Sequence, residues 1–339
     1  MRIIFMGTPQ FAVPALEKLI ESHHEVVAVV TQPDKTAGRG RKVVPPPVKE
    51  LALAHNIPVF QPEKLRGTNF HEVLRPFNPD VIVVAAYGKI LPPEILKLPR
   101  YGCINIHASL LPKYRGAAPI QWAIINGERK TGVTIMLLDE GMDTGNIIAT
   151  EEVEILDDDD TVSLSNMLSV VGANLLLEVL AKIEATGKVE STPQDHSLAT
   201  YAPLLKKSDG LIDWNLTTEQ IICRIQGLQP WPTAFSFLSG KMWKFLRAEP
   251  FEDPDNLYFA WLTKQDPKYQ PLPGFVTATI RGRGFTVKTG DGHLLVTKVQ
   301  PEAKAVMSGA DAVNGKLVKP GDLFISDPNF LLGRSDESA

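Results

Sequence analysis

Short apolar runs that alternate with helical patterns constrain this sequence more than any other feature. The run at residues 3–6 ends at Gly7, and apolar residues at helical spacing follow over residues 11–20. Further apolar runs are found at residues 26–30, 57–60, 81–85, 102–106 and 133–137. Strands that are apolar on both faces need cover on both faces, which is typical of a parallel sheet between helices. The first part of the chain is therefore predicted to be an α/β domain with an open, mostly parallel, Rossmann-like sheet.

Helical patterns separate and follow these runs. They lie at residues 48–56, 63–75, 118–126 and, as one long and largely apolar helix, 163–184. The chain then becomes polar over residues 187–208 and carries Pro193 and Pro203, which is typical of a connector. We therefore expect the first domain to end near residue 188.

The rest of the chain has a different pattern, with short alternating runs. These runs cover residues 234–238, 243–248, 274–280, 284–289 and 293–300. Gly290-Asp291-Gly292 separates the last two and is a tight hairpin signal. Short strands with glycine turns predict a second, small β-barrel domain of the OB-like kind. The expected division is a catalytic domain at 1–188, a linker at 189–206, a barrel at 207–325 and a tail at 326–339.

Charge is distributed unevenly between the two parts. Residues 1–199 carry 19 Lys+Arg against 24 Asp+Glu, whereas residues 200–320 carry 15 against 11. A positive second domain gives modest support for contact with a polyanion, although the charge alone is more simply explained by a mixed solvated surface.

Several classes of site are not indicated. Cys103 and Cys223 lie far apart without metal-ligand spacing, so neither a disulfide framework nor a zinc site is expected. His23 and His24 also lack ligand spacing and are expected to be exposed. The apolar run at residues 3–6 is too short for a signal sequence or a membrane span, which makes the cytoplasm the expected location.

Three polar residues form the best candidate for chemistry. Asn105 and His107 fall at the end of an expected central strand, where alternation places them on one face. Asp143 lies in a glycine-rich turn, and such loops at the carboxyl edge of parallel strands are where ligands bind. Asn and protonated His can donate to an oxyanion, and Asp can orient the imidazole. Because no GxSxG elbow is present, direct attack by a substrate amine is the simpler chemistry, although each residue could also have a purely structural role.

The segment at residues 36–42 (TAGRGRK) is the second candidate. It combines glycines with Arg39, Arg41 and Lys42, which can contact phosphates and, for arginine, base edges. A surface loop that is basic by chance is the alternative.

Longer motifs resemble the folate-dependent formyltransferases and, within that superfamily, the methionyl-tRNA formyltransferase family. They are residues 102–112 (GCINIHASLLP), 114–121 (YRGAAPIQ) and 138–146 (LDEGMDTGN), with further matches from residue 2 to about 325. The resemblance implies transfer of a formyl group from 10-formyltetrahydrofolate, as co-substrate, to methionyl-initiator-tRNA for translation initiation. It also implies that no metal or nicotinamide takes part, and we expect a monomer without a membrane partner.

The resemblance assigns roles residue by residue. Asn105, His107 and Asp143 match the catalytic set. The positions matching the folate-binding segments are Lys89, Ile90, Leu91, Ser109, Leu110, Leu111, Pro112, Asp139, Glu140 and Gly141. Those expected to contact tRNA are Arg39, Arg41, Lys42, Lys206 and Lys304.

Three alternatives remain open at this point. A formyltransferase acting on a small amine would explain Asn105, His107 and Asp143 but neither the basic loop nor the barrel. A noncatalytic RNA-binding protein would not need all three of these residues. A nicotinamide-dependent oxidoreductase is disfavoured because the turn at Gly7 lacks the G-x-G-x-x-G spacing.

Overall fold

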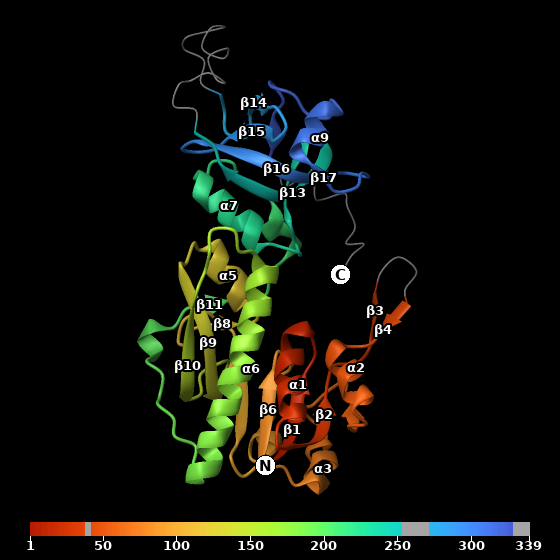
Figure 1. Ribbon diagram of the computed structural model, residues 1–339, viewed down its shortest axis with the longest axis vertical. Helices are drawn as coiled ribbons and strands as arrows, with labels where there is room; N and C mark the ends of the chain where they lie inside the picture. Colours follow the sequence, from red (N-terminus) through yellow and green to blue (C-terminus); the bar gives the residue numbers. More distant parts are fainter. Residues whose placement is uncertain (38–41, 253–270, 328–339) are drawn as a thin grey trace. The chain divides into compact units, whose positions relative to one another are not determined.

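The computed structural model describes residues 1–37, 42–252 and 271–327, which form two compact units (Figure 1). Unit 1 comprises Met1–Ile120, Arg129–Asp157 and Ser163–Leu204. Unit 2 comprises Gln121–Glu128, Asp158–Val162 and the described residues from Leu205 onward.

Unit 1 is built on a 7-stranded sheet with the order β10-β9-β7-β6-β1-β2-β5. Its strands are β1 (Arg2–Gly7), β2 (Glu25–Val30), β5 (Val59–Phe60), β6 (Val81–Ala85), β7 (Cys103–His107), β9 (Lys130–Leu137) and β10 (Ile147–Glu154). The pairs β1–β2, β1–β6, β2–β5 and β6–β7 are parallel, whereas β9 and β10 run antiparallel to their neighbours. The predicted open, mostly parallel sheet is confirmed.

The helices largely follow the predicted pattern. They are α1 (Val13–Glu21), α2 (Pro47–Ala54), α3 (Phe70–Leu74), α4 (Pro93–Leu96), α5 (Pro119–Ile125) and α6 (Thr161–Thr186). The helix predicted at residues 63–75 is wrong in its first half, because only α3 is helical there. Gly67 adopts φ 72°, a left-handed conformation that cannot continue a right-handed helix. Strand β10 was not predicted, since it carries Glu151, Glu152 and Glu154 in place of an apolar run.

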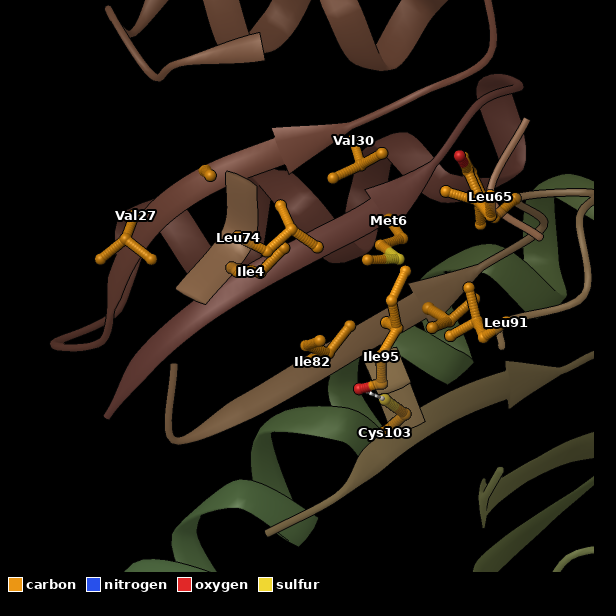
Figure 2. Packing of buried hydrophobic residues seen from close by; sticks show 13 residues of the cluster. Ile4, Met6, Val27, Val30, Leu65, Leu74, Ile82, Leu91, Ile95 and Cys103 are labelled. Carbon is orange, nitrogen blue, oxygen red and sulfur yellow. Dashed lines mark hydrogen bonds between the residues drawn. The ribbon is translucent and has the colours of Figure 1, made fainter. Parts of the chain in front are cut away.

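Both faces of the unit 1 sheet are buried, as the continuous apolar strands require. Figure 2 shows one face, where Ile4 and Met6 of β1 and Ile82 of β6 pack with residues that include Leu74 and Ile95. On the other face, Gly172 of α6 lies so close to Ile106 that an added Cβ would be 2.7 Å from its Cγ2 atom. The sheet is thus a rigid platform for the polar residues at its carboxyl edge.

Helix α6 has the length and apolar composition of a membrane span, with a mean hydropathy of 1.6 in its most apolar window. Half of that window is buried inside the protein. Its buried residues, among them Leu164, Leu168 and Leu176, recur at helical spacing. The apolar composition of α6 is accounted for by this packing.

The segment expected to be a linker, residues 189–206, packs on unit 1 over most of its length. Strand β11 (Tyr201–Ala202) pairs in parallel with β8 (Arg115–Gly116), and Thr192 exchanges two backbone hydrogen bonds with Ile147 of β10. This segment is therefore packed beside the loop that carries Asp143 and is not an extended linker.

Unit 2 is an antiparallel sheet of order β14-β15-β16-β13-β12-β18, with β17 (Met307–Ser308) paired to β16. The strands are β12 (Ala234–Leu238), β13 (Lys241–Pro250), β14 (Val276–Ile280), β15 (Gly284–Lys288), β16 (His293–Pro301) and β18 (Phe324–Ile325), accompanied by α7 (Thr218–Gly227) and α9 (Gly309–Asn314). Backbone bonds from Val276 to Asp322 and from Phe324 to Gly274 join the two ends of the sheet. The predicted small β-barrel is confirmed in this form.

Aromatic rings fill the interior of unit 2. The ring of Phe324 lies 5.1 Å from that of Phe245 and 5.6 Å from that of Trp243, between centroids. The Trp214 indole N–H donates to Ser236, whose hydroxyl donates to the backbone carbonyl of Ile325. The buried tryptophan is therefore satisfied within the barrel, as a buried indole requires.

Candidate active site

Strand β7 places Asn105 and His107 on one face near the carboxyl end of the sheet. Both are buried, with 9% and 6% of their surface exposed. Among the described residues, none makes a hydrogen bond to the side-chain amide of Asn105. The donor and acceptor groups of this amide are therefore available to a ligand.

The two ring nitrogens of His107 have different surroundings. Nε2 lies 3.0 Å from the carbonyl oxygen of Tyr114, which can only accept, so Nε2 carries a hydrogen. Nδ1 lies 3.7 Å from Oδ2 of Asp143, which is an ion-pair distance and too long for a hydrogen bond. Nδ1 is therefore the nitrogen at which a proton can be exchanged.

Asp143 is held in an unusual backbone conformation. Its φ is 53°, in the left-handed region that costs a non-glycine residue about 1 kcal/mol or more. Its Oδ2 accepts a hydrogen bond of 2.8 Å from the backbone N–H of Gly116. The side chain therefore faces His107 because the surrounding structure fixes the turn.

The 109–112 segment is held by hydrogen bonds to Thr134 of β9. The Thr134 hydroxyl donates to the carbonyl of Ser109 at 2.7 Å and accepts from the backbone N–H of Leu111 at 3.1 Å. The Ser109 hydroxyl donates to the carbonyl of Lys113 at 2.7 Å. Leu110 and Pro112 are half-buried, so the segment presents backbone and apolar groups more than a free serine hydroxyl.

The 89–91 segment divides its side chains between core and surface. Leu91 is buried in the core cluster, whereas Ile90 is exposed. The Lys89 amine donates to the carbonyls of Pro62 and Glu63, and desolvation lowers its pKa. This amine anchors the segment, which leaves backbone groups and Ile90 to meet a ligand.

The 139–141 turn is stabilised by the Asp139 carboxylate. Its Oδ1 accepts from the backbone N–H of Gly141 at 3.0 Å and from the Thr144 hydroxyl at 2.7 Å. Glu140 and Gly141 are exposed. Unit 1 thus contains all three segments expected to bind folate together with Asn105, His107 and Asp143.

The described ends of the basic segment belong to a hairpin in which β3 (Lys35–Ala37) pairs antiparallel with β4 (Lys42–Val44). Arg39 and Arg41 lie outside the described residues, and Lys42 begins β4. At the base of the hairpin, the Lys49 amine and the Gln61 amide both donate to the Asp34 carboxylate, at 2.7 Å each. These hydrogen bonds, first from Gln61 and then from Lys49, hold the pKa of Asp34 below its usual value.

Lys206 and Lys304 are exposed on unit 2. Lys304 lies in the turn between β16 and β17, two residues before Val306, which lines a groove of about 590 Å³. The groove is also lined by the cations Arg247 and Lys298 and the carboxylates Glu249 and Asp311. Its charge is balanced, so the groove alone does not select a polyanion.

Two histidines and a glutamate come together at the opposite end of the sheet. His23, His24 and Glu184 place ligand-type atoms within 4.8 Å of one another. The expectation that both histidines are exposed is wrong for His24, which is buried. Glu184 accepts from the Met1 amine at 3.0 Å and pairs with His23 at 2.7 Å. These hydrogen bonds account for the cluster without a metal.

Sequence reasoning missed the residues that support Asp143. They are Arg115, in strand β8, and Gln194, in the expected linker. Thr134, which holds the 109–112 segment, was missed as well. No local pattern distinguishes a polar residue that bonds to a backbone carbonyl about 50 positions away, so the sequence held no signal for Gln194.

Comparison with known proteins follows the same division of the chain. A formyl transferase family profile matches residues 1–180, and the profile of the formyl transferase C-terminal domain matches residues 204–317. The methionyl-tRNA formyltransferase of Pelotomaculum thermopropionicum is 46% identical over 321 residues, covering 95% of this chain and 97% of that relative. The enzyme of the same name from Sulfurihydrogenibium sp. is 47% identical over 326 residues, covering 96% and 100%.

Solved structures agree in fold. The sugar 3N-formyl transferase WlaRD has a TM-score of 0.63 at 19% identity, over 90% of this chain and 99% of that one. The methionyl-tRNA formyltransferase from Clostridium thermocellum has a TM-score of 0.51 at 20% identity, over 74% and 93%. The full-length identity to the curated relatives goes further than this shared fold: the chain belongs to the methionyl-tRNA formyltransferase family.

Proposed function

We infer that this protein transfers the formyl group of 10-formyltetrahydrofolate to the amino group of methionyl-initiator-tRNA. The observation that carries the proposal is the buried pair of Asn105 and His107 beside Asp143, in a chain of this family. The Asn105 amide without a described partner is a donor for the oxygen of a formyl group.

The reaction is proton-neutral overall. The substrate amine attacks the formyl carbon, the bond from that carbon to the folate nitrogen breaks, and the amine proton ends on the leaving nitrogen. Asn105 donates to the oxyanion that forms in between. His107 exchanges the proton at Nδ1, beside the Asp143 carboxylate, while its Nε2–H bond to the Tyr114 carbonyl holds the ring in place.

The remaining assignments complete the proposal. Folate contacts residues 89–91, 109–112 and 139–141, largely through backbone groups. Arg39, Arg41 and Lys42 of the basic segment and Lys206 and Lys304 of unit 2 contact tRNA phosphates. The protein works in the cytoplasm as a monomer, with neither a metal nor a nicotinamide.

A formyl-transfer assay tests the proposal with three acceptors: initiator methionyl-tRNA, elongator methionyl-tRNA and free methionine. We expect rapid transfer to the initiator alone. Transfer to free methionine or to another small amine at a comparable rate would contradict it and favour a small-molecule formyltransferase.

A further inference from the structure

Arg115 is a buried cation without a carboxylate partner among the described residues. Only 2% of its surface is exposed. Its Nη2 donates to Oε1 of Gln194 at 2.7 Å and to Nδ1 of His196 at 2.9 Å, while Nε has no hydrogen-bond partner in the described chain. Burial of a guanidinium without a carboxylate partner costs several kcal/mol of folding free energy. An arginine at position 115 is therefore explained by a role other than stabilising the fold.

Gln194 is the residue that Arg115 orients. Its Nε2 donates to the backbone carbonyl of Asp143 at 2.9 Å and to that of Gly145 at 2.7 Å. Because Arg115 can only donate, it fixes Oε1 on its own side and turns the NH2 group toward the two carbonyls. Each end of the buried amide therefore has one defined role.

The conformation of the turn at residues 143–145 is not one that its own residues favour, so contacts from elsewhere must hold it. Asp143 is left-handed, and a Cβ at Gly145 would lie 1.8 Å from the carbonyl oxygen of Leu137. The Gly116 N–H holds the carboxylate of Asp143, and Gln194 holds the backbone on both sides of Thr144. The two supports act on different groups of the same turn.

We propose that Gln194, oriented by the buried Arg115, is a positioning residue that aims the Asp143 carboxylate at Nδ1 of His107. The proposal rests on the proposed function, which assigns Asp143 and His107 to catalysis. Gln194 itself touches no reacting atom. Its effect on the reaction passes through the geometry of Asp143.

Substitution of Gln194 tests this directly. Gln194→Ala is expected to lower kcat by about 10- to 100-fold, because displacement of a catalytic group by about 1 Å can have that effect. KM for folate and for tRNA should change by less than about threefold. Gln194→Glu keeps the size and the bond to Arg115 but cannot donate to the carbonyls of Asp143 and Gly145. The kcat of Gln194→Glu should fall by a similar factor. This variant also provides the test if Gln194→Ala folds poorly.

Gln229→Ala is the matched control. Gln229 is a partly buried glutamine of unit 2 whose Nε2 also donates to two backbone carbonyls, those of Ile225 and Phe245. Its loss should leave kcat unchanged.

A double-mutant cycle separates positioning from a general structural role. In an Asp143→Asn background, Gln194→Ala should lower kcat further by less than about twofold, since residues that act as one unit are not additive. The same factor in both backgrounds would overturn the proposal, because Gln194 would then act independently of Asp143.

Amide hydrogen exchange over residues 139–146 gives a readout that does not need activity. Exchange should be faster in Gln194→Ala than in the wild type or in Gln229→Ala. If the wild type transfers formyl groups but Gln194→Ala shows unchanged exchange and unchanged kcat, the positioning role is wrong and the proposed function stands. A wild type without formyl transfer overturns the proposed function, while faster exchange would still show that Gln194 holds the turn.

Discussion

The carboxyl edge of the unit 1 sheet and the interior of unit 2 are built from opposite materials. The edge carries Ala86, Tyr114 and Asp143, all with positive φ, beside buried polar side chains. The interior of unit 2 is made of rings in edge-to-face and stacked contact around Phe324. Strain and unpaired donors gather at candidate sites, whereas apolar packing supplies stability. Mutations should therefore be able to impair the candidate site without unfolding the protein, and to destabilise unit 2 without altering the candidate site.

Phe324→Ala should give the largest effect on stability. Removing a ring packed against Trp243, Phe245 and Phe285 is expected to cost unit 2 about 3–5 kcal/mol of unfolding free energy. Trp122, Trp214, Trp231 and Trp243 lie in unit 2, and Trp261 lies outside the described residues, so urea unfolding followed by tryptophan fluorescence reports on that unit. Leu323→Ala, at a partly exposed neighbour, is the control and should cost about 1 kcal/mol or less. Equal losses of unfolding free energy in the two variants would contradict a stabilising role for the ring cluster.

Asp143→Asn and His107→Ala should have the converse effect, on turnover and not on folding. Each is expected to lower formyl transfer by about 100-fold or more, because both are proposed to act on charge and proton transfer in the transition state. Binding of initiator tRNA should be retained. The exposed Asp157, which pairs with Arg129, provides a neutral comparison as Asp157→Asn. Near-normal turnover at saturating substrates would take the altered residue out of the catalytic set.

Removal of the proposed tRNA-binding cations should give a graded effect on binding alone. Alanine at Arg41, Lys42, Lys206 or Lys304 should flatten the log-log dependence of tRNA affinity on salt by at most about one unit for each phosphate that is no longer neutralised. Arg39→Ala should reduce affinity more than Arg41→Ala, since Arg39 stands between Gly38 and Gly40, which permit close approach of the backbone, and its guanidinium can then reach base edges. Folate affinity, measured in parallel, should not change in any of these variants.

Lys188→Ala is the control for these measurements, at an exposed position beyond α6. A salt dependence as steep in Arg39→Ala as in the wild type, with normal formylation, would make the hairpin an ordinary solvated turn.

The smallest effect is expected at Glu184, which forms a cluster with His23 and His24 at the end of the unit 1 sheet opposite the candidate site. Hydrogen bonds from His23 and the N-terminal amine lower the pKa of Glu184 from 4.5 to about 2. A lowered folded-state pKa stabilises above pH 4.5 and loses that contribution as pH falls toward 2. Glu184→Gln should thus be destabilised relative to the wild type by about 1 kcal/mol or less near pH 7, and the two should converge near pH 2.

Glu178→Gln, at an exposed position on the same helix, should match the wild type at every pH. Urea unfolding of all three proteins between pH 2 and 7 makes the test. A constant difference across that range would mean that the Glu184 side chain stabilises by packing, without its charge.

The sequence was most informative where one local pattern decides the structure. Continuous apolar runs identified β1, β2, β6, β7 and β9, and alternation identified the barrel strands. Strand β10 escaped because its pairing with β9 depends on a partner and not on its own glutamate-rich composition. Motifs brought Asn105, His107 and Asp143 to attention, but the left-handed turn at Asp143 and its hold by Gln194 arise from contacts between distant segments, which no local pattern encodes.

The two margins of the unit 1 sheet bear on self-association. An exposed strand edge can template pairing with a second copy and so begin aggregation. Strand β5 offers only Val59–Phe60 at one margin, too short to recruit another strand. Strand β10 at the other margin is long, but its Glu151, Glu152 and Glu154 would face the like charges of any second copy. The sheet therefore opposes the addition of a further strand by a different means at each side: by the shortness of one edge strand and by the negative charge of the other.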